Sequence, residues 1–85
     1  MAYKLTVKGE TRIIRDVRHH SDTDFYAFYQ GHTIHVIIDG NGRGYAWCTA
    51  PDGCYIVDGY VGKDTLEAGI QMCMDNIFYE EEEAA

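Results

Sequence analysis

The sequence predicts an α+β fold, in which an antiparallel β-sheet of about four to six strands, arranged as a meander, is covered on one face by a single C-terminal α-helix. Up to residue 61, short runs of β-branched and aromatic residues alternate with glycine-rich turns, as in strands joined by tight connections. Residues 66–77 instead repeat apolar side chains at helical spacing. The 85 residues are enough for one core, so we expect a single domain over residues 1–85.

The first predicted element is a hairpin. Residues 3–7 alternate apolar and polar side chains, Gly9 and Glu10 supply a turn, and residues 11–17 continue with β-branched side chains. Residues 19–24 are then expected to form a loop.

The next element is ambiguous in type. Residues 25–29 fit either a strand or a short helix capped by Asp22 or Asp24. Four of these five residues are aromatic, which favours the strand, and Gly31 would turn the chain after it.

Three further strands are predicted at residues 33–38, 45–49 and 54–61. The glycine-rich segment 39–44 and the segment 50–53, which contains Pro51, join them as turns. The result is a three-stranded meander.

Symmetric pairing about the two turns predicts which side chains share a face. One face would carry Ile34, Val36, Ile38, Tyr45, Trp47, Tyr55 and Val57, with Trp47 opposite both Val36 and Tyr55, and Tyr45 opposite both Ile38 and Val57. The other, less apolar face would carry His35, Ile37, Ala46, Cys48, Cys54 and Ile56. In this register Cys48 and Cys54 are cross-strand neighbours.

The last element is predicted to be a helix. Asp64 and Glu67 fit a capping box. The apolar stripe that should cover the sheet consists of Leu66, Ile70, Cys73 and Ile77. We expect the packed helix to end near Tyr79, because continuing it would crowd carboxylates at the negative end of the helix dipole. Residues 80–85 would then form a flexible acidic tail in solvent.

Several classes of site are excluded by spacing. The glycine-rich segment 39–44 resembles the start of a calcium loop, but Arg43 and Ala50 stand where ligands are required, and no helix follows to bind a phosphate. The cysteines and histidines form no Cys-x-x-Cys pair, so no metal or other cofactor is expected. No catalytic signature occurs, which predicts a protein that is not an enzyme.

The charge distribution points to a protein partner. Seven Lys and Arg residues stand against fourteen Asp and Glu, for a net charge of −7, and nine of the acidic residues lie in residues 44–85. This balance argues against direct binding to nucleic acid or to an anionic membrane. An acidic surface with an aromatic neighbour can instead contact a basic protein or ribonucleoprotein. The predicted partner-binding residues are Asp75, Tyr79, Glu80, Glu81, Glu82 and Glu83.

In its short length, acidity, aromatic-rich sheet and lack of catalytic signature, the chain resembles the small inhibitor proteins of bacteriophages and mobile elements, such as anti-CRISPR and anti-restriction proteins. The resemblance covers the overall character of the chain, and it implies a non-enzymatic inhibitor or adaptor that acts on a CRISPR effector or another nucleic-acid-binding defence protein in the bacterial cytoplasm. The competing hypothesis is a structural or regulatory homo-oligomer, such as a homodimer, that buries Ile37, Ala46 and Ile56 against a copy of itself. A weaker third hypothesis is a redox or metal module using Cys48 and Cys54.

Overall fold

The computed structural model describes the backbone of residues 1–84 and the side chains of residues 1–79. Seven strands and one helix lie within these residues. They are β1 (Tyr3–Val7), β2 (Glu10–Ile14), β3 (Asp16–His20), β4 (Asp24–Tyr29), β5 (His32–Ile38), β6 (Gly44–Thr49), β7 (Tyr55–Tyr60) and α1 (Leu66–Ala84).

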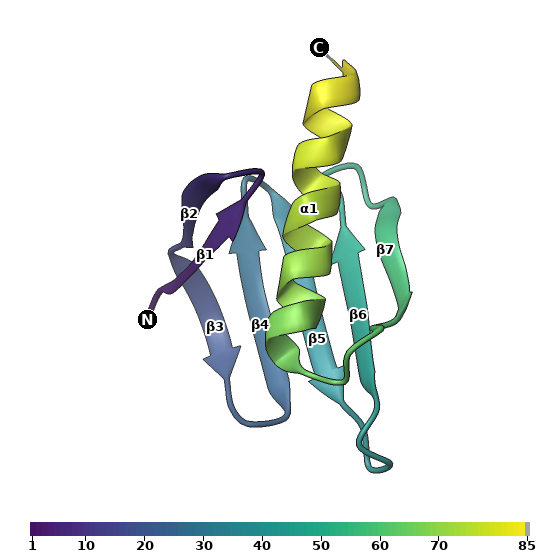
Figure 1. Cartoon of the computed structure of the whole chain (residues 1–85). Coiled ribbons are helices and arrows are strands. Elements are labelled where there is room, and N and C mark those ends of the chain that lie inside the picture. The colour runs from purple at the N-terminus through teal and green to yellow at the C-terminus, as the bar shows by residue number, and fades with distance from the viewer. Residues whose placement is uncertain (85) are drawn as a thin grey trace.

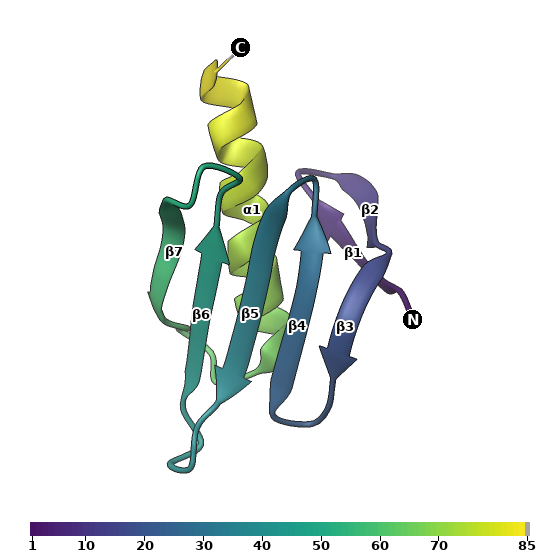
Figure 2. The same cartoon turned by 180° about the vertical axis from the view of Figure 1, so that it is seen from behind.

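The strands form two antiparallel sheets. β3 to β7 make a five-stranded sheet in sequence order, and β1 pairs with β2 in a separate two-stranded sheet. The helix lies across one face of the larger sheet, with the β1–β2 hairpin beside it on the same side (Figure 1). Seen from behind, the other face of the larger sheet is uncovered (Figure 2). The predicted α+β meander with a C-terminal helix is therefore confirmed, with the first hairpin as a second sheet.

The first half of the chain forms more strand than the sequence predicted. The predicted strand at residues 11–17 is divided between β2 and β3, with exposed Arg15 at the break. The predicted loop at residues 19–24 is wrong at both ends, because His19 and His20 belong to β3 and Asp24 begins β4, where it pairs with Ile37. Pairing with β4 thus extends β3, and the favoured strand at residues 25–29 is confirmed.

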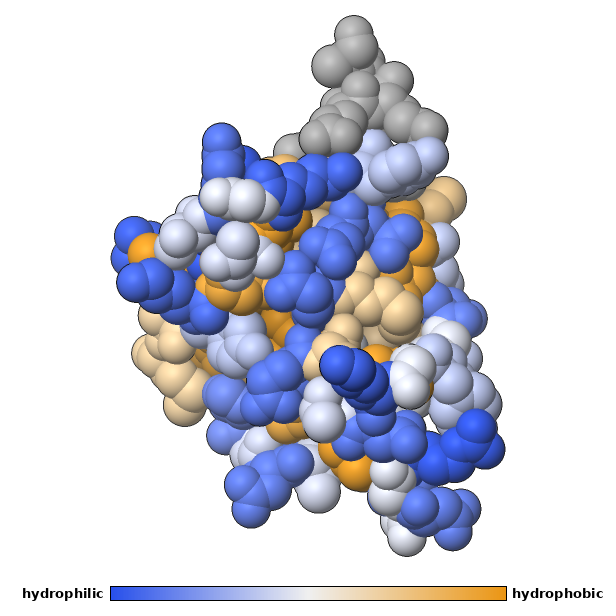
Figure 3. All heavy atoms as spheres, viewed as in Figure 1, coloured by the Kyte–Doolittle hydropathy of each residue, from blue (hydrophilic) through white to orange (hydrophobic). Residues whose placement is uncertain are grey.

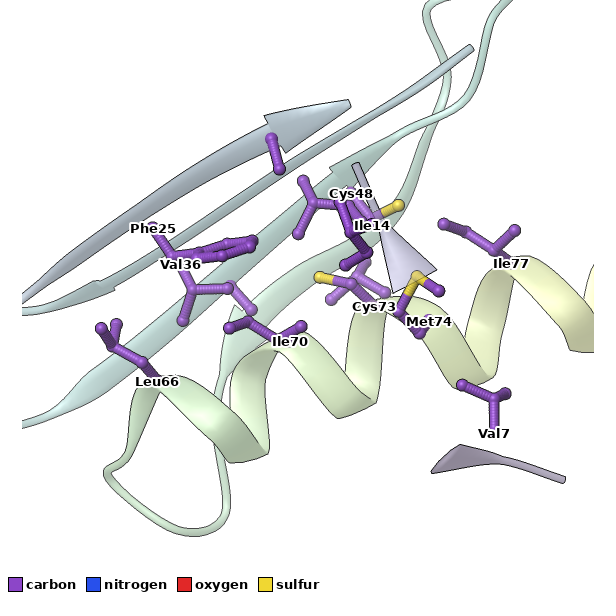
Figure 4. Packing of buried hydrophobic residues seen from close by; sticks show 14 of the residues in the cluster. Val7, Ile14, Phe25, Val36, Cys48, Leu66, Ile70, Cys73, Met74 and Ile77 are labelled. Atoms are coloured by element: carbon purple, nitrogen blue, oxygen red, sulfur yellow. The ribbon is translucent and has the colours of Figure 1, made fainter. Parts of the chain in front are cut away.

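The core lies between the helix and the covered face of the larger sheet. Figure 4 shows Phe25 and Val36 from the sheet facing the apolar side of α1. The predicted helix stripe, Leu66, Ile70, Cys73 and Ile77, is buried there together with Met74. The small hairpin contributes Val7 and Ile14, which are 1% and 0% exposed, so it closes the flank of the core.

The predicted register of the β5–β6 hairpin is wrong by one residue. Ile38 pairs with Gly44, and Val36 with Ala46, because the amide of Asp39 donates to the carbonyl of Arg43 at 2.8 Å and closes a five-residue connection. A shift of one residue moves every side chain to the opposite face. The covered face therefore carries Ala46 and Cys48, both 0% exposed, whereas Tyr45 and Trp47 point away from the helix.

The β6–β7 hairpin also differs from the symmetric prediction. Trp47 pairs with Asp58, and Cys48 with Val57, after an irregularity in the register between Cys48 and Thr49. Cys48 is buried and Cys54 is exposed in the turn, so the two are not cross-strand neighbours and the redox or metal module built on them is wrong.

The third cysteine is a core residue, as predicted. Cys73 is fully buried, and its thiol donates a hydrogen bond to the carbonyl of Trp47 at 3.5 Å. The pKa of the Cys73 thiol is raised, mainly by hydrogen bonding with Cys48 and secondly by burial. This side chain therefore stays protonated.

The helix begins with a different cap from the predicted capping box. The amide of Ala68 donates to Oγ1 of Thr65 at 3.1 Å, which makes Thr65 the N-cap residue. Asp64 instead accepts a hydrogen bond from the amide of Gly44 at 2.8 Å, and so links the helix entrance to β6.

The end of the helix also differs from the prediction. Its backbone continues through Ala84 rather than ending near Tyr79, although the last buried side chain among the described residues is Phe78. The predicted flexible acidic tail, residues 80–85, lies outside the residues whose side chains the structure describes.

Candidate binding surface on the open face of the sheet

The structure brings together two of the predicted partner-binding residues. Asp75 and Tyr79 are both exposed, one helical turn apart on α1, and they line a shallow hollow of about 410 Å³ with Lys8 and Asn76. Gln71 donates a hydrogen bond to Asp75 at 2.9 Å, and the ammonium group of Lys8 lies 5.8 Å from the centre of the Tyr79 ring. The side chains of Glu80, Glu81, Glu82 and Glu83 lie outside the described residues. On the helix side as a whole, hydrophilic side chains predominate, with separate apolar patches between them (Figure 3).

The uncovered face of the five-stranded sheet, hereafter the open face, is more distinctive. Successive side chains of a strand point to opposite faces, so the pairing register defines which residues lie there in rows. The middle row runs from β3 to β7 through His19, Tyr26, His35, Trp47 and Asp58. The rows on either side are Asp16, Phe28, Thr33, Thr49 and Tyr55, and Asp24, Ile37, Tyr45 and Tyr60.

The rings of the open face contact one another in a continuous series. His35 stacks on Trp47 with centroids 5.0 Å apart, and Tyr45 contacts Trp47 at 4.6 Å. Edge contacts extend the series to Tyr26 on one side and Tyr60 on the other. Phe28 then contacts Tyr26 at 5.4 Å. The series crosses four of the five strands, so it forms one aromatic surface.

This surface is accessible. Tyr55 and Tyr60 are 63% and 59% exposed, and the other rings are partly exposed. A shallow hollow of about 300 Å³ lies over the sheet, lined by Tyr26, Thr33, His35, Trp47, Thr49 and Tyr55. Trp47 is the one tryptophan of the chain, which makes it a specific reporter for this surface.

The charges of the open face nearly balance. The guanidinium of Arg18 lies over the Phe28 ring and that of Arg43 over the Tyr60 ring, at 5.1 and 4.4 Å from the ring centres. The anions of the same face are Asp16, Asp24 and Asp58. Two cations against three anions leave −1, compared with −7 for the whole chain. Most of the net charge therefore lies elsewhere on the molecule.

Two of these carboxylates are held by neighbours. Arg18 donates hydrogen bonds to Asp16, which lower the pKa of that carboxyl group. The hydroxyl of Tyr45 donates a hydrogen bond to Asp58 at 2.7 Å. This bond is the main cause that raises the pKa of Tyr45, and desolvation is the second. Both interactions hold these side chains in place on the open face, beside the aromatic rings.

Sequence reasoning missed the open face because it placed Tyr45 and Trp47 over the core. The homo-oligomer surface predicted from Ile37, Ala46 and Ile56 is also wrong, since Ala46 is core and Ile56 packs against the core. The informative signal was side-chain size. Small Ala46 and Cys48 allow the helix to approach the sheet closely, whereas a tryptophan on that face would not fit.

Two further observations concern the part of the chain that the structure describes. There, no three His, Cys, Asp or Glu side chains come together as a group that could hold a metal ion. Within the same residues, no helix has the length and apolar character needed to cross a membrane. In comparisons with known proteins, no family model, no curated protein and no solved structure matches this chain.

Proposed function

We propose that this chain is a non-enzymatic protein-binding module, an adaptor or inhibitor, and that the open face is its principal binding surface. The observation that carries the proposal is the uncovered series of ring contacts from Phe28 to Tyr60. Tyrosine, tryptophan and arginine are the residues that most often anchor protein interfaces, and all three occur on this face. Apolar rings left in water are also a cost that a partner would relieve.

A second surface would serve a basic target. Asp75 and Tyr79 are exposed together on α1, and most of the negative charge of the chain lies off the open face. Such a surface attracts cationic groups at long range and accelerates association at low salt. We propose that the target is a bacterial protein or ribonucleoprotein with a basic surface, such as a CRISPR effector or another nucleic-acid-binding defence protein, met in the bacterial cytoplasm.

Direct nucleic-acid binding fits the open face poorly, although bases do stack on aromatic side chains. Backbone phosphates require a basic track, and here three carboxylates outnumber the two arginines. We therefore favour protein over nucleic acid as the partner.

The test compares variants of the tagged protein in capture from a bacterial lysate at low and moderate salt. Trp47→Ala removes the central ring of the open face, and Asp75→Lys reverses charge on the helix side. Thr11→Ala, at an exposed position of β2, is the matched control. We expect each of the first two variants to lose captured protein that the control retains, with the Asp75 effect fading at moderate salt. Identical capture by all three variants would overturn the proposal.

A further inference from the structure

We propose that the occupant of the open face is a second copy of this chain, packed face to face so that two five-stranded sheets form a two-layer sandwich. The inference rests on the proposed function in one respect, namely that the open face binds protein. In this arrangement each sheet has a helix on its outer side and the partner's sheet on its inner side, so both faces are covered.

The area of the face fits a self-interface. Five strands spaced about 4.8 Å apart, with about six residues each at about 3.4 Å, make a rectangle on the order of 500 Å². Two copies would bury on the order of 1,000 Å² before the contours of the rings are counted, which reaches the lower limit for a specific interface. Aligned sheets pack about 10 Å apart with interleaved side chains, and large aromatic rings can fill that space.

The distribution of charge permits this pairing. Two copies of a chain with a net charge of −7 repel each other, but only −1 of that charge lies on the open face. Face-to-face packing leaves the acidic helix sides pointing outward, where water and salt screen them. A nucleic acid bound to the open face would instead be repelled by the net negative charge of the chain, and no continuous row of basic side chains on this face would offset that repulsion.

The order of the strands makes the face complementary to itself. Consider a two-fold axis between the sheets that runs along the central strand, β5. This axis places β3 over the partner's β7 and β4 over the partner's β6, because the strand order is β3 to β7. Within the middle row, Tyr26 then faces the partner's Trp47, and His19 faces the partner's Asp58.

Charge follows the same arrangement. In the middle row, the imidazole of His19 on β3 faces the carboxylate of the partner's Asp58 on β7, and this contact occurs twice, once at each end of the interface. Arg18 is paired with Asp16 on β3, and Arg43 lies over Tyr60 on β7, so neither edge carries a large net charge. An axis across the strands would instead place the Asp58 side chains of the two copies opposite each other. The geometry selects the axis along β5.

The dimer is tested first by sedimentation velocity and Trp47 emission over a dilution series from about 1 to about 300 μM, a range that spans the affinities of small interfaces. We expect a dimer at the upper end, with the emission of Trp47 shifting to shorter wavelength as the rings are buried. Trp47→Ala should raise the dissociation constant at least about thirtyfold, since it removes the central ring from both ends of the interface. Thr11→Ala, at an exposed position of β2 outside the five-stranded sheet, is the control and should leave the dissociation constant unchanged.

A charge exchange tests the axis. His19→Asp should weaken the dimer about tenfold, because it places a second carboxylate opposite the partner's Asp58, whereas Asp58→Lys alone should weaken it less. The double variant should recover most of the wild-type affinity. Circular dichroism of each variant confirms that a weaker dimer is not an unfolded chain.

The outcomes separate the inference from the proposed function. A wild-type chain that stays monomeric at about 300 μM overturns the self-interface, while loss of lysate capture by Trp47→Ala would still support a protein-binding open face. A dimer that Trp47→Ala leaves intact overturns the assignment of this face to the dimer. A double variant, His19→Asp with Asp58→Lys, that dimerises no more tightly than His19→Asp alone overturns the axis along β5. Binding of a single-stranded oligonucleotide that shifts Trp47 emission more strongly than self-association would overturn the choice of partner.

Discussion

Gly69 lies on the helix directly against Val36 of the sheet, and its replacement by alanine tests the packing of helix on sheet. A Cβ atom at Gly69 would lie 2.4 Å from Cγ1 of Val36, 3.2 Å from Cγ2 of Val36 and 3.3 Å from Cγ2 of Val61. Ordinary contacts begin at 3.4 Å, so the helix or Val36 would have to move by about 1 Å. Val36 is 0% exposed, so other core side chains enclose it and resist its displacement.

Two opposing effects determine the result. Alanine in place of glycine favours a helix by up to about 1 kcal/mol. Overpacking a core by one methyl group costs about 1–3 kcal/mol, and the shortest contact here places the cost toward the upper end. We therefore expect Gly69→Ala to lower the free energy of unfolding by about 1–2 kcal/mol. For a domain of this size, the melting temperature should fall by between about 4 and about 16 °C.

The assay is urea and thermal unfolding followed by circular dichroism, with Gly40→Ala as the control. No atom lies within 4 Å of a Cβ built at Gly40, so that substitution should be nearly neutral. Val36→Ala should relieve the clash, so the double variant Gly69→Ala with Val36→Ala should be at least about 1 kcal/mol more stable than the sum of the single effects predicts. A Gly69→Ala protein more stable than wild type, or strictly additive effects, would refute the close approach of helix and sheet.

Three further predictions concern single hydrogen bonds or turns. Thr65→Ala should cost about 1 kcal/mol of unfolding free energy while Thr65→Ser costs little, because Thr65 caps the helix; equal losses in urea unfolding would contradict this role. The pKa of Tyr45 is higher in the folded protein than the ordinary phenol value of 10.0, so its bond to Asp58 stabilises the fold. This contribution to stability is complete below pH 10.0 and is lost as the pH rises through the pKa of Tyr45 in the folded protein. Absorbance titration should therefore show a tyrosine whose pKa falls in Asp58→Asn, and no change would refute the bond. Gln30 has a φ of 47°, where a residue with a Cβ atom costs about 1–2 kcal/mol, and glycine avoids this cost but loses about 0.5–1 kcal/mol more conformational entropy on folding. Gln30→Gly should therefore raise the unfolding free energy by about 0.5–1 kcal/mol, whereas a loss would show that the side chain itself stabilises the turn.

The elements of this fold were predictable because each has a strong local pattern. Alternating residues near Tyr3 and the helical spacing of the stripe from Leu66 to Ile77 both depend only on neighbours in sequence. The aromatic run beginning at Phe25 was correctly favoured as a strand because rings suit a pleated surface.

The register and the open face were not predictable in the same way. Both depend on how the connection closes between Asp39 and Arg43, where one residue more or less exchanges the two faces of β6. Both faces of β6 also looked apolar, because Trp47 and Cys48 are each common in cores. Small Ala46 and Cys48, both 0% exposed, lie on the covered face, so the face with the smaller side chains is the one that packs against the core.

The cap of the helix was missed for a related reason. Asp64 and Thr65 are both good N-cap residues, and sequence alone favoured Asp64 because Glu67 completes a capping box. The structure uses the Asp64 carboxylate for a bond to the amide of Gly44, twenty positions earlier in the chain, and leaves Thr65 to cap. Long-range contacts of this kind leave no local pattern.

The position of α1 after all seven strands affects how the protein is made. Every pairing within the larger sheet joins strands that are consecutive in the chain, so each hairpin can close as soon as its second strand leaves the ribosome. Until the helix has followed, however, Val36 lacks the cover that the helix provides at Gly69, and the rings of the opposite face are exposed at the same time. A nascent chain stalled before residue 66 is therefore expected to be a substrate for chaperones, and translation of the helix is the step that releases it.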